Sequence, residues 1–475
     1  MSVEATPSAA TRVRPRKGEE VELTIDSLAH GGAGVGRADA GFVVFVRGAV
    51  PGDRVRARIE KAKRSFAEAR LEELVQPSPE RLAPATPHPG APWQVLPYER
   101  QLAEKERQVG DALTRLGGFT DPPVKSIMPA VEPLRYRNKL EYSFGESESG
   151  TPQGGTSELA LGFHRAGRWD VIDDIESDVL ASERVDELRL AARAWCREEG
   201  LSAYDRHDHS GFLRNLVVRE GRRTGQLQAR LVTSAGAFRH DEFAAAMPAD
   251  SVLWTQAEGV AETTRGGKLK TLKGEAAIEE QLDLGGARLR FRISPDAFFQ
   301  TNTEMAEQLY GVAVQAAGLT GRERVIDLYC GIGTIALAMA LDSREVVGVE
   351  VVERAVADAI ENAKLNGVDN ARFFAGDIRT AMRPLLEHPL WGHRQEGARA
   401  DVLVIDPPRA GLSQKVVRRV LEAEAQRIVY VSCNPTTLAP NARQLVDAGY
   451  ELRSVQPVDM FPQTPHIECV ALLTR

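Results

Sequence analysis

The sequence predicts a doubly wound α/β sheet in its C-terminal part, preceded by a small β-barrel and an α+β region. From about residue 291, short apolar strands alternate with helical segments, as in a sheet covered by helices on both faces. Between residues 18 and 76, short strands of alternating polarity are separated by glycine-rich turns, which indicates a barrel. A chain of 475 residues is long enough for about three such domains.

The N-terminal segment, residues 1–17, is poor in apolar side chains, so we expect a flexible tail and no signal peptide. In the predicted barrel, residues 18–76, alternation marks strands at 21–25, 42–46 and 55–59, with a glycine-rich turn at 30–36. Six cationic side chains lie between Arg54 and Arg64, against one carboxylate. This composition suits a local nucleic-acid contact and equally a solvated strand edge.

A proline-rich boundary, with six prolines between residues 76 and 92, separates the barrel from a central α+β region at 77–290. An amphipathic helix is predicted at about 98–116, and we expect it to pack on the C-terminal domain. A loop rich in Gly and Ser follows near 149–157. The C-terminal domain is assigned to residues 291–475.

A cofactor site is predicted where the strand at 324–328 runs into Gly331 and Gly333 and then into a helix. Glycines let the backbone approach a ligand closely, and ligands of open α/β sheets bind at the carboxyl ends of strands. Glu350 and Asp377 follow the next two strands, where they suit a ribose and an adenine. The spacing also suits NAD, and glycines can simply tighten a turn. The acidic Asp327 and the motifs downstream favour a different nucleotide cofactor.

Three further strand ends bring reactive groups to the same edge: Asp406 after the fourth strand, Cys433 after the fifth and Glu468 before the last. If the domain is a methyltransferase, an oxygen or nitrogen acceptor would need no thiol. Carbon 5 of uracil, in contrast, is a poor nucleophile and needs covalent activation. A thiolate that adds to carbon 6 activates carbon 5, and a base must later remove the carbon-5 proton. Cys433 and Glu468 fit these two roles, although an inert buried thiol at a strand end is the alternative for Cys433.

The cysteines, histidines, apolar runs and net charge limit the cellular location and the kinds of site that we expect. Cys196, Cys330 and Cys469 are widely spaced and are expected to be structural, so reduced thiols and a cytoplasmic location are predicted. His207 and His209 have no companion cluster, so no metal site is expected. The longest apolar run is too short for a membrane span. A net charge of −7 argues against indiscriminate coating of nucleic acid.

Five motifs occur in the order found in the RNA 5-methyluridine methyltransferases that act on tRNA and large-subunit rRNA, and the chain resembles that family. They are Phe-Phe-Gln-Thr-Asn at 298–302, Asp-Leu-Tyr-Cys-Gly at 327–331, Asp-Pro-Pro-Arg-Ala-Gly-Leu at 406–412, Ser-Cys-Asn-Pro at 432–435 and His-Ile-Glu at 466–468. The resemblance implies a Rossmann-like class I methyltransferase domain and an N-terminal TRAM domain, an OB-like RNA-binding barrel. It also implies S-adenosyl-L-methionine as cofactor and structured RNA, rRNA or tRNA, as partner.

The motif positions imply roles for single residues. Cys433 corresponds to the nucleophile and Glu468 to the base, and the cofactor-binding candidates are Gln300, Tyr329, Gly331, Gly333, Thr334, Glu350, Asp377 and Asp406. Thr334 stands where the family often has Asn. Residues 136–139 and 163–165 resemble segments near the RNA surface, or carry ordinary sheet-surface charge. We expect a monomer that needs no protein partner.

The sequence departs from the family at the iron–sulfur cluster that many members carry. Its cysteines are replaced here by residues 88–91 and, near the later position, by Asp178. Since cluster ligands are thiolates, no cluster is expected, and packing alone should hold the proline-rich turn. The alternatives are a non-catalytic TRAM-type RNA-binding or chaperone protein, a methyltransferase acting on another base or on protein, and a dehydrogenase.

Overall fold

The computed structural model describes residues 14–38, 41–146, 158–165, 167–260, 263–387 and 400–475. The predicted loop at 149–157 and most of the predicted tail at 1–17 lie outside these residues. The chain forms two compact units. The smaller contains the described residues up to 87 together with 91–108 and 462–466, and the larger contains the rest.

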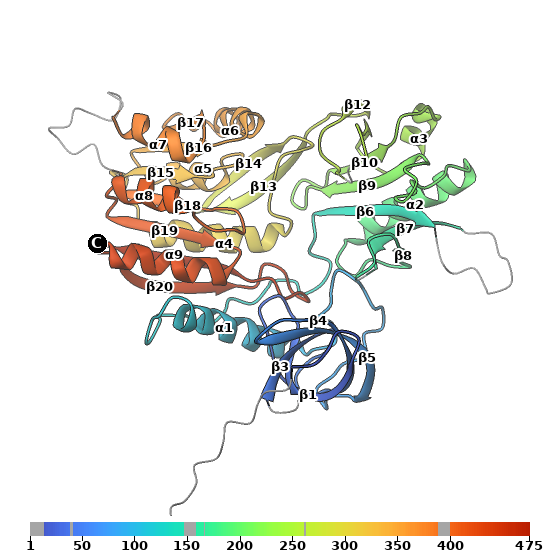
Figure 1. The fold of residues 1–475 in the computed structure, drawn as a ribbon. Coiled ribbons are helices and arrows are strands. Elements are labelled where there is room, and N and C mark those ends of the chain that lie inside the picture. The colour runs from blue at the N-terminus through green and yellow to red at the C-terminus, as the bar shows by residue number, and fades with distance from the viewer. Residues whose placement is uncertain (1–13, 39–40, 147–157, 166, 261–262, 388–399) are drawn as a thin grey trace, which may run out of the picture. The chain divides into compact units, whose positions relative to one another are not determined.

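The smaller unit is built on a closed five-stranded barrel with the strand order β1-β2-β3-β5-β4 (Figure 1). Alternating side chains of its strands, including Leu23, Val44, Val55 and Ile59, point inward and form a buried apolar core. β3 and β5 run parallel, and the other neighbouring pairs run antiparallel. The strands are β1 (Glu20–Leu28), β2 (Gly34–Ala38), β3 (Phe42–Arg47), β4 (Arg54–Ala62) and β5 (Phe66–Gln76).

The predicted turn at 30–36 is partly wrong, because β2 begins at Gly34. A Cβ at Gly36 would collide with the Leu23 side chain and the Thr24 carbonyl, so β1 and β2 can pair this closely only where β2 has glycine. β5 was not predicted at all. Its charged sequence hides the alternation of buried and exposed positions at its beginning.

The cationic side chains of β4 are mostly neutralised on the barrel surface. Arg54 pairs with Glu22 at 2.6 Å, Arg58 with Glu72 at 3.0 Å and Lys61 with Glu68 at 3.5 Å, and Arg56 pairs with Glu73. Exposed pairs of this kind contribute little to stability. They do reduce the positive field of the strand.

The central region forms a seven-stranded sheet with the order β12-β11-β10-β9-β6-β7-β8. α2 (Glu183–Glu198) and α3 (His240–Ala246) pack on it through a shared apolar core that includes Val185, Leu188 and Phe243. Its strands are β6 (Lys139–Glu146), β7 (Leu159–His164), β8 (Ile172–Asp174), β9 (Leu213–Glu220), β10 (Leu227–Thr233), β11 (Ser251–Gln256) and β12 (Lys268–Lys273).

The C-terminal part of the chain is a second seven-stranded sheet, ordered β17-β16-β15-β18-β19-β21-β20. All neighbouring strands are parallel except those that pair with β21. The strands are β15 (Arg324–Leu328), β16 (Glu345–Glu350), β17 (Ala371–Ala375), β18 (Val402–Ile405), β19 (Arg427–Ser432), β20 (Glu451–Val458) and β21 (Glu468–Thr474). β20 was not predicted, whereas the other six strands were.

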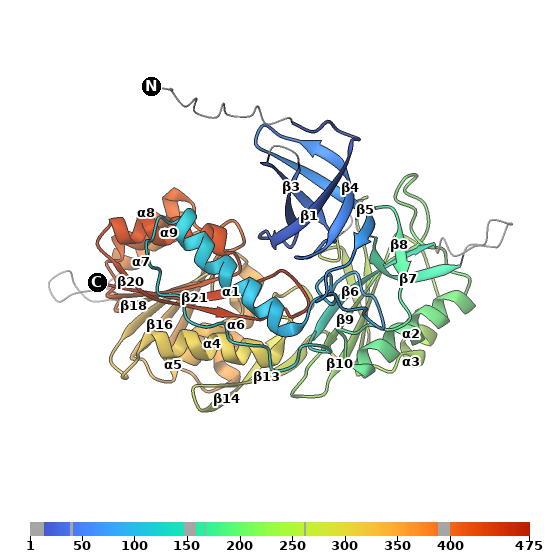
Figure 2. The same ribbon diagram turned by 90° about the horizontal axis from the view of Figure 1, so that it is seen from below.

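Helices cover both faces of this sheet, as Figure 2 shows. One face carries α4 (Thr303–Ala317), α5 (Thr334–Ala340) and α6 (Glu353–Leu365), and the other α7 (Ile378–Glu387), α8 (Gln414–Glu422) and α9 (Pro435–Asp447). The later residues of α1 (Tyr98–Arg115), among them Val109 and Leu113, join the core of the second face. No helix in the described part of the chain has the length and apolar character needed to cross a membrane.

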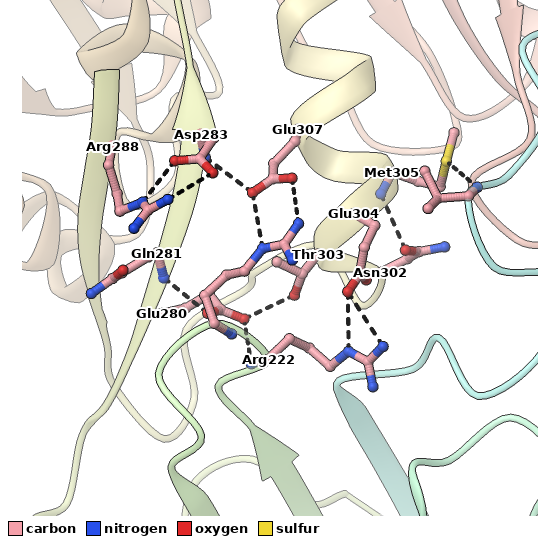
Figure 3. A network of polar contacts seen from close by, with 12 residues as sticks. Arg222, Glu280, Gln281, Asp283, Arg288, Asn302, Thr303, Glu304, Met305 and Glu307 are labelled. Atoms are coloured by element: carbon pink, nitrogen blue, oxygen red, sulfur yellow. Dashed lines mark hydrogen bonds and ion pairs between the residues drawn. The ribbon is translucent and has the colours of Figure 1, made fainter. Parts of the chain in front are cut away.

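A buried polar network joins the central sheet to the start of α4 (Figure 3). Glu280, from the hairpin of β13 (Ile278–Leu284) and β14 (Ala287–Ile293), accepts hydrogen bonds from the Arg222 amide at 2.7 Å and the Thr303 hydroxyl at 2.9 Å. The Arg222 side chain also pairs with Glu304 at 3.3 Å. These contacts fix the entry of α4, directly after the Phe-Phe-Gln motif.

Candidate active site

Three parallel strands end at the same edge of the C-terminal sheet. Leu328 of β15 pairs with Ile405 of β18, which in turn pairs with Tyr430 of β19. Each strand runs directly into one of the motifs. The motifs at 327–331, 406–412 and 432–435 therefore meet at this carboxyl edge. This is the edge at which open α/β sheets bind ligands.

Cys433 directly follows β19 and Glu468 begins β21, and these two strands are antiparallel neighbours. Ser432 of β19 is paired with Cys469 of β21, and Cys433 and Glu468 are the residues next to this last pair, close enough for the charge of Glu468 to raise the pKa of the thiol. Glu468 is buried and Cys433 is partly exposed, so the thiol is the member of the pair that a substrate can reach.

Asn434 holds the turn that carries Cys433. Its side chain accepts a hydrogen bond from the Thr436 amide at 3.0 Å and thereby caps α9. The same side chain donates to the Arg409 carbonyl at 3.1 Å. One amide therefore links the Cys433 turn to the loop that follows Asp406, which accounts for an Asn after the cysteine.

The surroundings of Cys433 raise its pKa and the pKa values of the neighbouring carboxyl groups. Burial, together with the charges of Glu468 and Asp406, raises the pKa of the Cys433 thiol to about 11, while Arg409 opposes the shift. Burial also raises the pKa of Asp406 to about 7 and, with the charge of Asp406, holds the pKa of Glu468 well above its ordinary value. Without a bound ligand, the Cys433 thiol is therefore protonated at neutral pH, and the protonated form of Glu468 is favoured relative to an exposed carboxyl group.

The glycine-rich turn adopts an unusual backbone conformation. Tyr329 has a φ of 66°, which is rare for a residue with a side chain, and Gly331 and Gly333 have φ of 54° and 88°. Glu350 accepts a hydrogen bond from the Gly331 amide at 3.2 Å and from the Val352 amide at 2.9 Å. The end of β16 is thus tied directly to the turn after β15.

A narrow cavity opens beside this turn. Its lining includes the Phe298–Phe299 pair, Tyr310, the segment 329–332 and the carboxylates of Asp327 and Asp406. Asp327 is buried, and neither of its carboxylate oxygens has a hydrogen-bond partner among the described residues. Burial raises the pKa of Asp327 well above its ordinary value, and the charges of Asp406 and Glu350 add to the effect. A cationic ligand group would relieve this cost, because it would pair an otherwise unmatched charge.

The structure places the predicted cofactor residues unevenly around the cavity. Tyr329, Gly331, Thr334 and Asp406 line it. Gln300 is buried and opposes the rise that burial causes in the pKa of Tyr310, which itself lines the cavity, so its side chain lies close to that lining. Gly333 caps α5 and Glu350 holds the turn, so both support the cavity from behind.

Asp377 is the candidate furthest from this arrangement. It is not part of the cavity lining, and its carboxylate is already engaged by Arg379. That hydrogen bond lowers the pKa of Asp377 to about 2. A ligand that needs this carboxylate must share it with the guanidinium.

Two residues at the candidate site, Tyr310 in the cavity lining and Arg409 near Cys433, had no assigned role in the sequence. Tyr310 lies on α4, where it continues an apolar face and gives no sign of its polar contacts. Arg409 belongs to a predicted motif, and it is the cation that opposes the raised pKa of both Cys433 and Glu468. The motif shows that Arg409 is present, but the sequence does not show that its charge acts on Cys433 and Glu468.

Residues 136–139, which resembled an RNA-surface segment, are largely structural. Tyr136 is buried, and Asn138 donates hydrogen bonds to the Gln300 carbonyl and the Thr303 hydroxyl, both at 2.9 Å. Lys139 pairs with Glu141 at 2.6 Å. Asn138 therefore supports the Phe-Phe-Gln loop from the central sheet.

The expectation that packing alone holds the proline-rich turn is wrong. His88 Nε2 lies 3.0 Å from an Asp178 oxygen, and both side chains are fully buried. Asp178 also accepts hydrogen bonds from the Tyr142 hydroxyl and the Leu180 amide, each at 2.8 Å. A compact polar cluster therefore ties residue 88 to the central sheet.

The other thiols are buried and inert. Burial raises the pKa of Cys196 to about 12 and that of Cys330 and Cys469 well above the ordinary range for a thiol. Inert buried thiols of this kind are structural. Among the described residues, no group of three or more potential metal ligands comes together.

Comparison with known proteins agrees with this geometry. A model of the tRNA (uracil-5-)-methyltransferase family matches residues 240–475, and a TRAM-domain model matches residues 14–71. An uncharacterized RNA methyltransferase of Halalkalibacterium halodurans is 38% identical over 96% of this chain and 97% of its own length. One from Chlorobaculum tepidum is 38% identical over 99% of both. The chain belongs to the RNA uracil-5 methyltransferase family.

A solved member of this family shares the whole fold. The tRNA (uracil-54, C5)-methyltransferase of Pyrococcus abyssi, solved in complex with S-adenosyl-L-homocysteine, matches with a TM-score of 0.73 at 27% identity. The match covers 95% of this chain and all of the archaeal one. The predicted architecture, a TRAM barrel and a class I methyltransferase domain, is thereby confirmed.

Proposed function

We propose that the protein methylates carbon 5 of a specific uridine in tRNA or large-subunit rRNA, with Cys433 as nucleophile and Glu468 as base. The observation that carries the proposal is that both residues adjoin the last pair of β19 and β21, Ser432 with Cys469, where the charge of Glu468 acts on the Cys433 thiol. Family membership supplies the reaction class. A scaffold that only binds RNA would have no use for a thiol opposed by a buried carboxyl group.

Cys433 would add through Sγ to carbon 6 of the uracil, which makes carbon 5 an enolate carbon able to attack a methyl group. The pKa of the thiol is raised in the free protein, so its proton must leave before attack. Arg409 favours the thiolate, since it is the charge that opposes the pKa shift. The partly exposed position of Cys433 leaves its sulfur accessible to a base turned out of its stack.

Glu468 would complete the reaction. After carbon 5 has gained the methyl group, it still carries its proton, and the ionised carboxylate removes it. The electrons of that C–H bond restore the double bond between carbons 5 and 6, and Cys433 leaves as a thiolate. Burial of Glu468 raises its pKa, which makes the ionised form a strong base for this step.

We assign S-adenosyl-L-methionine to the cavity at the glycine turn, where it would, when bound, supply the methyl group as a sulfonium. Gly331 gives close backbone access, and the unpaired carboxylate of Asp327 suits a cation. Gln300, Tyr329, Thr334 and Asp406 would hold the cofactor, with Gly333, Glu350 and Asp377 at its margin. S-adenosyl-L-homocysteine in the archaeal relative supports this assignment.

The test is methylation of RNA. Purified protein, S-adenosyl-L-methionine and unmodified transcripts of tRNA and large-subunit rRNA should yield 5-methyluridine in one transcript, detected by nucleoside mass spectrometry. The same assay names the substrate. If the protein binds the cofactor and either RNA but forms no 5-methyluridine in either, the proposed function is wrong.

A further inference from the structure

A groove lies between the N-terminal halves of α7 and α8. The two helices lie side by side on one face of the C-terminal sheet (Figure 1). Both helices follow parallel strands, so their N-termini lie at the same carboxyl edge as the candidate active site. The groove encloses about 340 Å³. It is lined by Asp377, Arg379, Thr380, Lys415, Arg418 and Arg419.

The lining is strongly cationic, with four basic side chains and one carboxylate. Arg379 is engaged by Asp377, and Arg419 pairs with Glu422 at 2.6 Å. Lys415 and Arg418 are exposed and have no ion pair within the described residues. The groove therefore keeps an uncompensated positive charge on a chain whose net charge is −7.

The packing of α8 does not require the cationic side chains of Lys415 and Arg418. α8 is anchored by Val416, Val417 and Val420, which are buried, whereas Lys415 and Arg418 lie on its outer side. Basic residues close to a helix N-terminus oppose the helix dipole, and like charges three residues apart repel each other. Both effects destabilise α8 slightly, and a bound anion would reverse both.

The chain connects this groove to the reactive groups. The segment from Asp406 to Ser413 runs from the cavity to the cap of α8, and Asn434 anchors its Arg409 carbonyl. Asp377, at the groove, follows β17, and β16 and β15 separate β17 from β18. An extended polyanion that places one unit at Cys433 has other units within reach of this edge.

We propose that the groove of Arg379, Lys415 and Arg418 binds backbone phosphates of the RNA strand that flanks the target uridine. This inference rests on the proposed function and deepens it. Phosphate contacts fix the register of a strand without reading its sequence, which is what a base turned out of its stack requires. The contrast with β4, whose cations are mostly paired, supports α8 as the stronger electrostatic contact.

The experiment compares two double variants that remove the same charge. Lys415→Ala with Arg418→Ala empties the groove of its unpaired cations. Arg322→Ala with Arg344→Ala is the matched control, because both side chains are exposed at the opposite, amino-terminal edge of β15 and β16. RNA affinity is measured by fluorescence anisotropy over a salt series, on the transcript that the wild type methylates. S-adenosyl-L-homocysteine binding is measured by calorimetry.

The groove variant should bind RNA about 10-fold more weakly at low salt, and its slope of log affinity against log salt should be shallower by about 1.4. The control should retain wild-type affinity, and both variants should bind S-adenosyl-L-homocysteine normally. Wild-type affinity and slope in the groove variant, or equal losses in both variants, would overturn this inference alone. A wild type that neither binds nor methylates RNA would overturn the proposed function with it.

Discussion

Asp178 in the central sheet and Glu468 in the C-terminal sheet are both buried carboxyl groups, and their protonation is shifted in opposite directions. Burial raises the pKa of Asp178, but the hydrogen bond and charge of His88, together with the Leu180 amide and Tyr142 hydroxyl, more than compensate and lower it. In the part of the chain that the structure describes, Glu468 has no comparable set of donors, so burial and the charge of Asp406 raise its pKa.

The difference separates a structural carboxylate from a reactive one. A buried charge that is fully paired is costly to disturb but has no tendency to take up a proton. A buried carboxyl group without partners is poised to exchange protons, which is the property expected at a catalytic site. We therefore expect substitutions at the two clusters to separate stability from catalysis.

The largest effect is expected for Cys433→Ala. Removal of the sulfur leaves no group to activate uracil carbon 5, so methylation should fall below detection while cofactor binding persists. Nucleoside mass spectrometry and calorimetry give the two readouts. Cys196→Ala is the control, because it removes a buried thiol of α2 from the central sheet and should leave methylation intact. Turnover by Cys433→Ala would exclude the covalent mechanism.

Glu468→Gln should reduce turnover by about 10²–10⁴-fold, the usual contribution of a positioned general base. Because addition and methyl transfer precede proton removal, a covalent protein–RNA species should also accumulate on natural RNA. Denaturing gel electrophoresis would reveal it. Glu451→Gln, at the exposed start of β20, should show neither effect. Slow turnover without any adduct would place Glu468 before methyl transfer.

His88→Ala should act on stability instead. The substitution leaves Asp178 as a buried charge without its main partner, at a cost of about 3–5 kcal/mol. Calorimetry should show a lower melting temperature, with methylation per folded molecule unchanged at about 25 °C. His164→Ala removes a histidine that is only partly buried and should cost much less. A loss of activity without a loss of stability would contradict the contrast between the two clusters.

A smaller effect concerns pH. The pKa of Asp406 is raised to about 7, so this group is neutral in acid and ionises as the pH rises through that value. An ionised carboxylate attracts the sulfonium of S-adenosyl-L-methionine, whereas S-adenosyl-L-homocysteine has no such charge. Affinity for the first should increase by up to about 10-fold between about pH 6 and pH 8, and affinity for the second much less. Asp406→Asn should flatten the difference measured by calorimetry.

Much of the fold was predictable because buried strands show themselves by apolar runs. Six strands of the C-terminal sheet were predicted in this way, while β20 was hidden by its alternating polar residues and Pro457. β2 was hidden by the glycines that its close pairing requires. β20 is an edge strand paired only with β21, and such a strand leaves a weaker apolar pattern than a strand buried on two faces.

The site was predictable only as a set of motifs. Spacing brought Asp406, Cys433 and Glu468 to one edge, but it could not show that Arg379 engages Asp377 or that Arg409 opposes the pKa shift of Cys433. The pairing of His88 with Asp178 joins residues 90 positions apart and has no local pattern at all. Protonation states depend on such tertiary contacts, so they follow from the structure alone.

The most direct test of the central claim is covalent trapping with RNA that carries 5-fluorouridine in place of uridine. After addition of Cys433 and methyl transfer, carbon 5 holds fluorine in place of the proton that Glu468 removes, so the adduct cannot break down. Intact-mass analysis should show protein plus RNA plus one methyl group, and peptide mapping should place the link at Cys433. Normal methylation of uridine with no adduct on the fluorinated RNA would contradict the account.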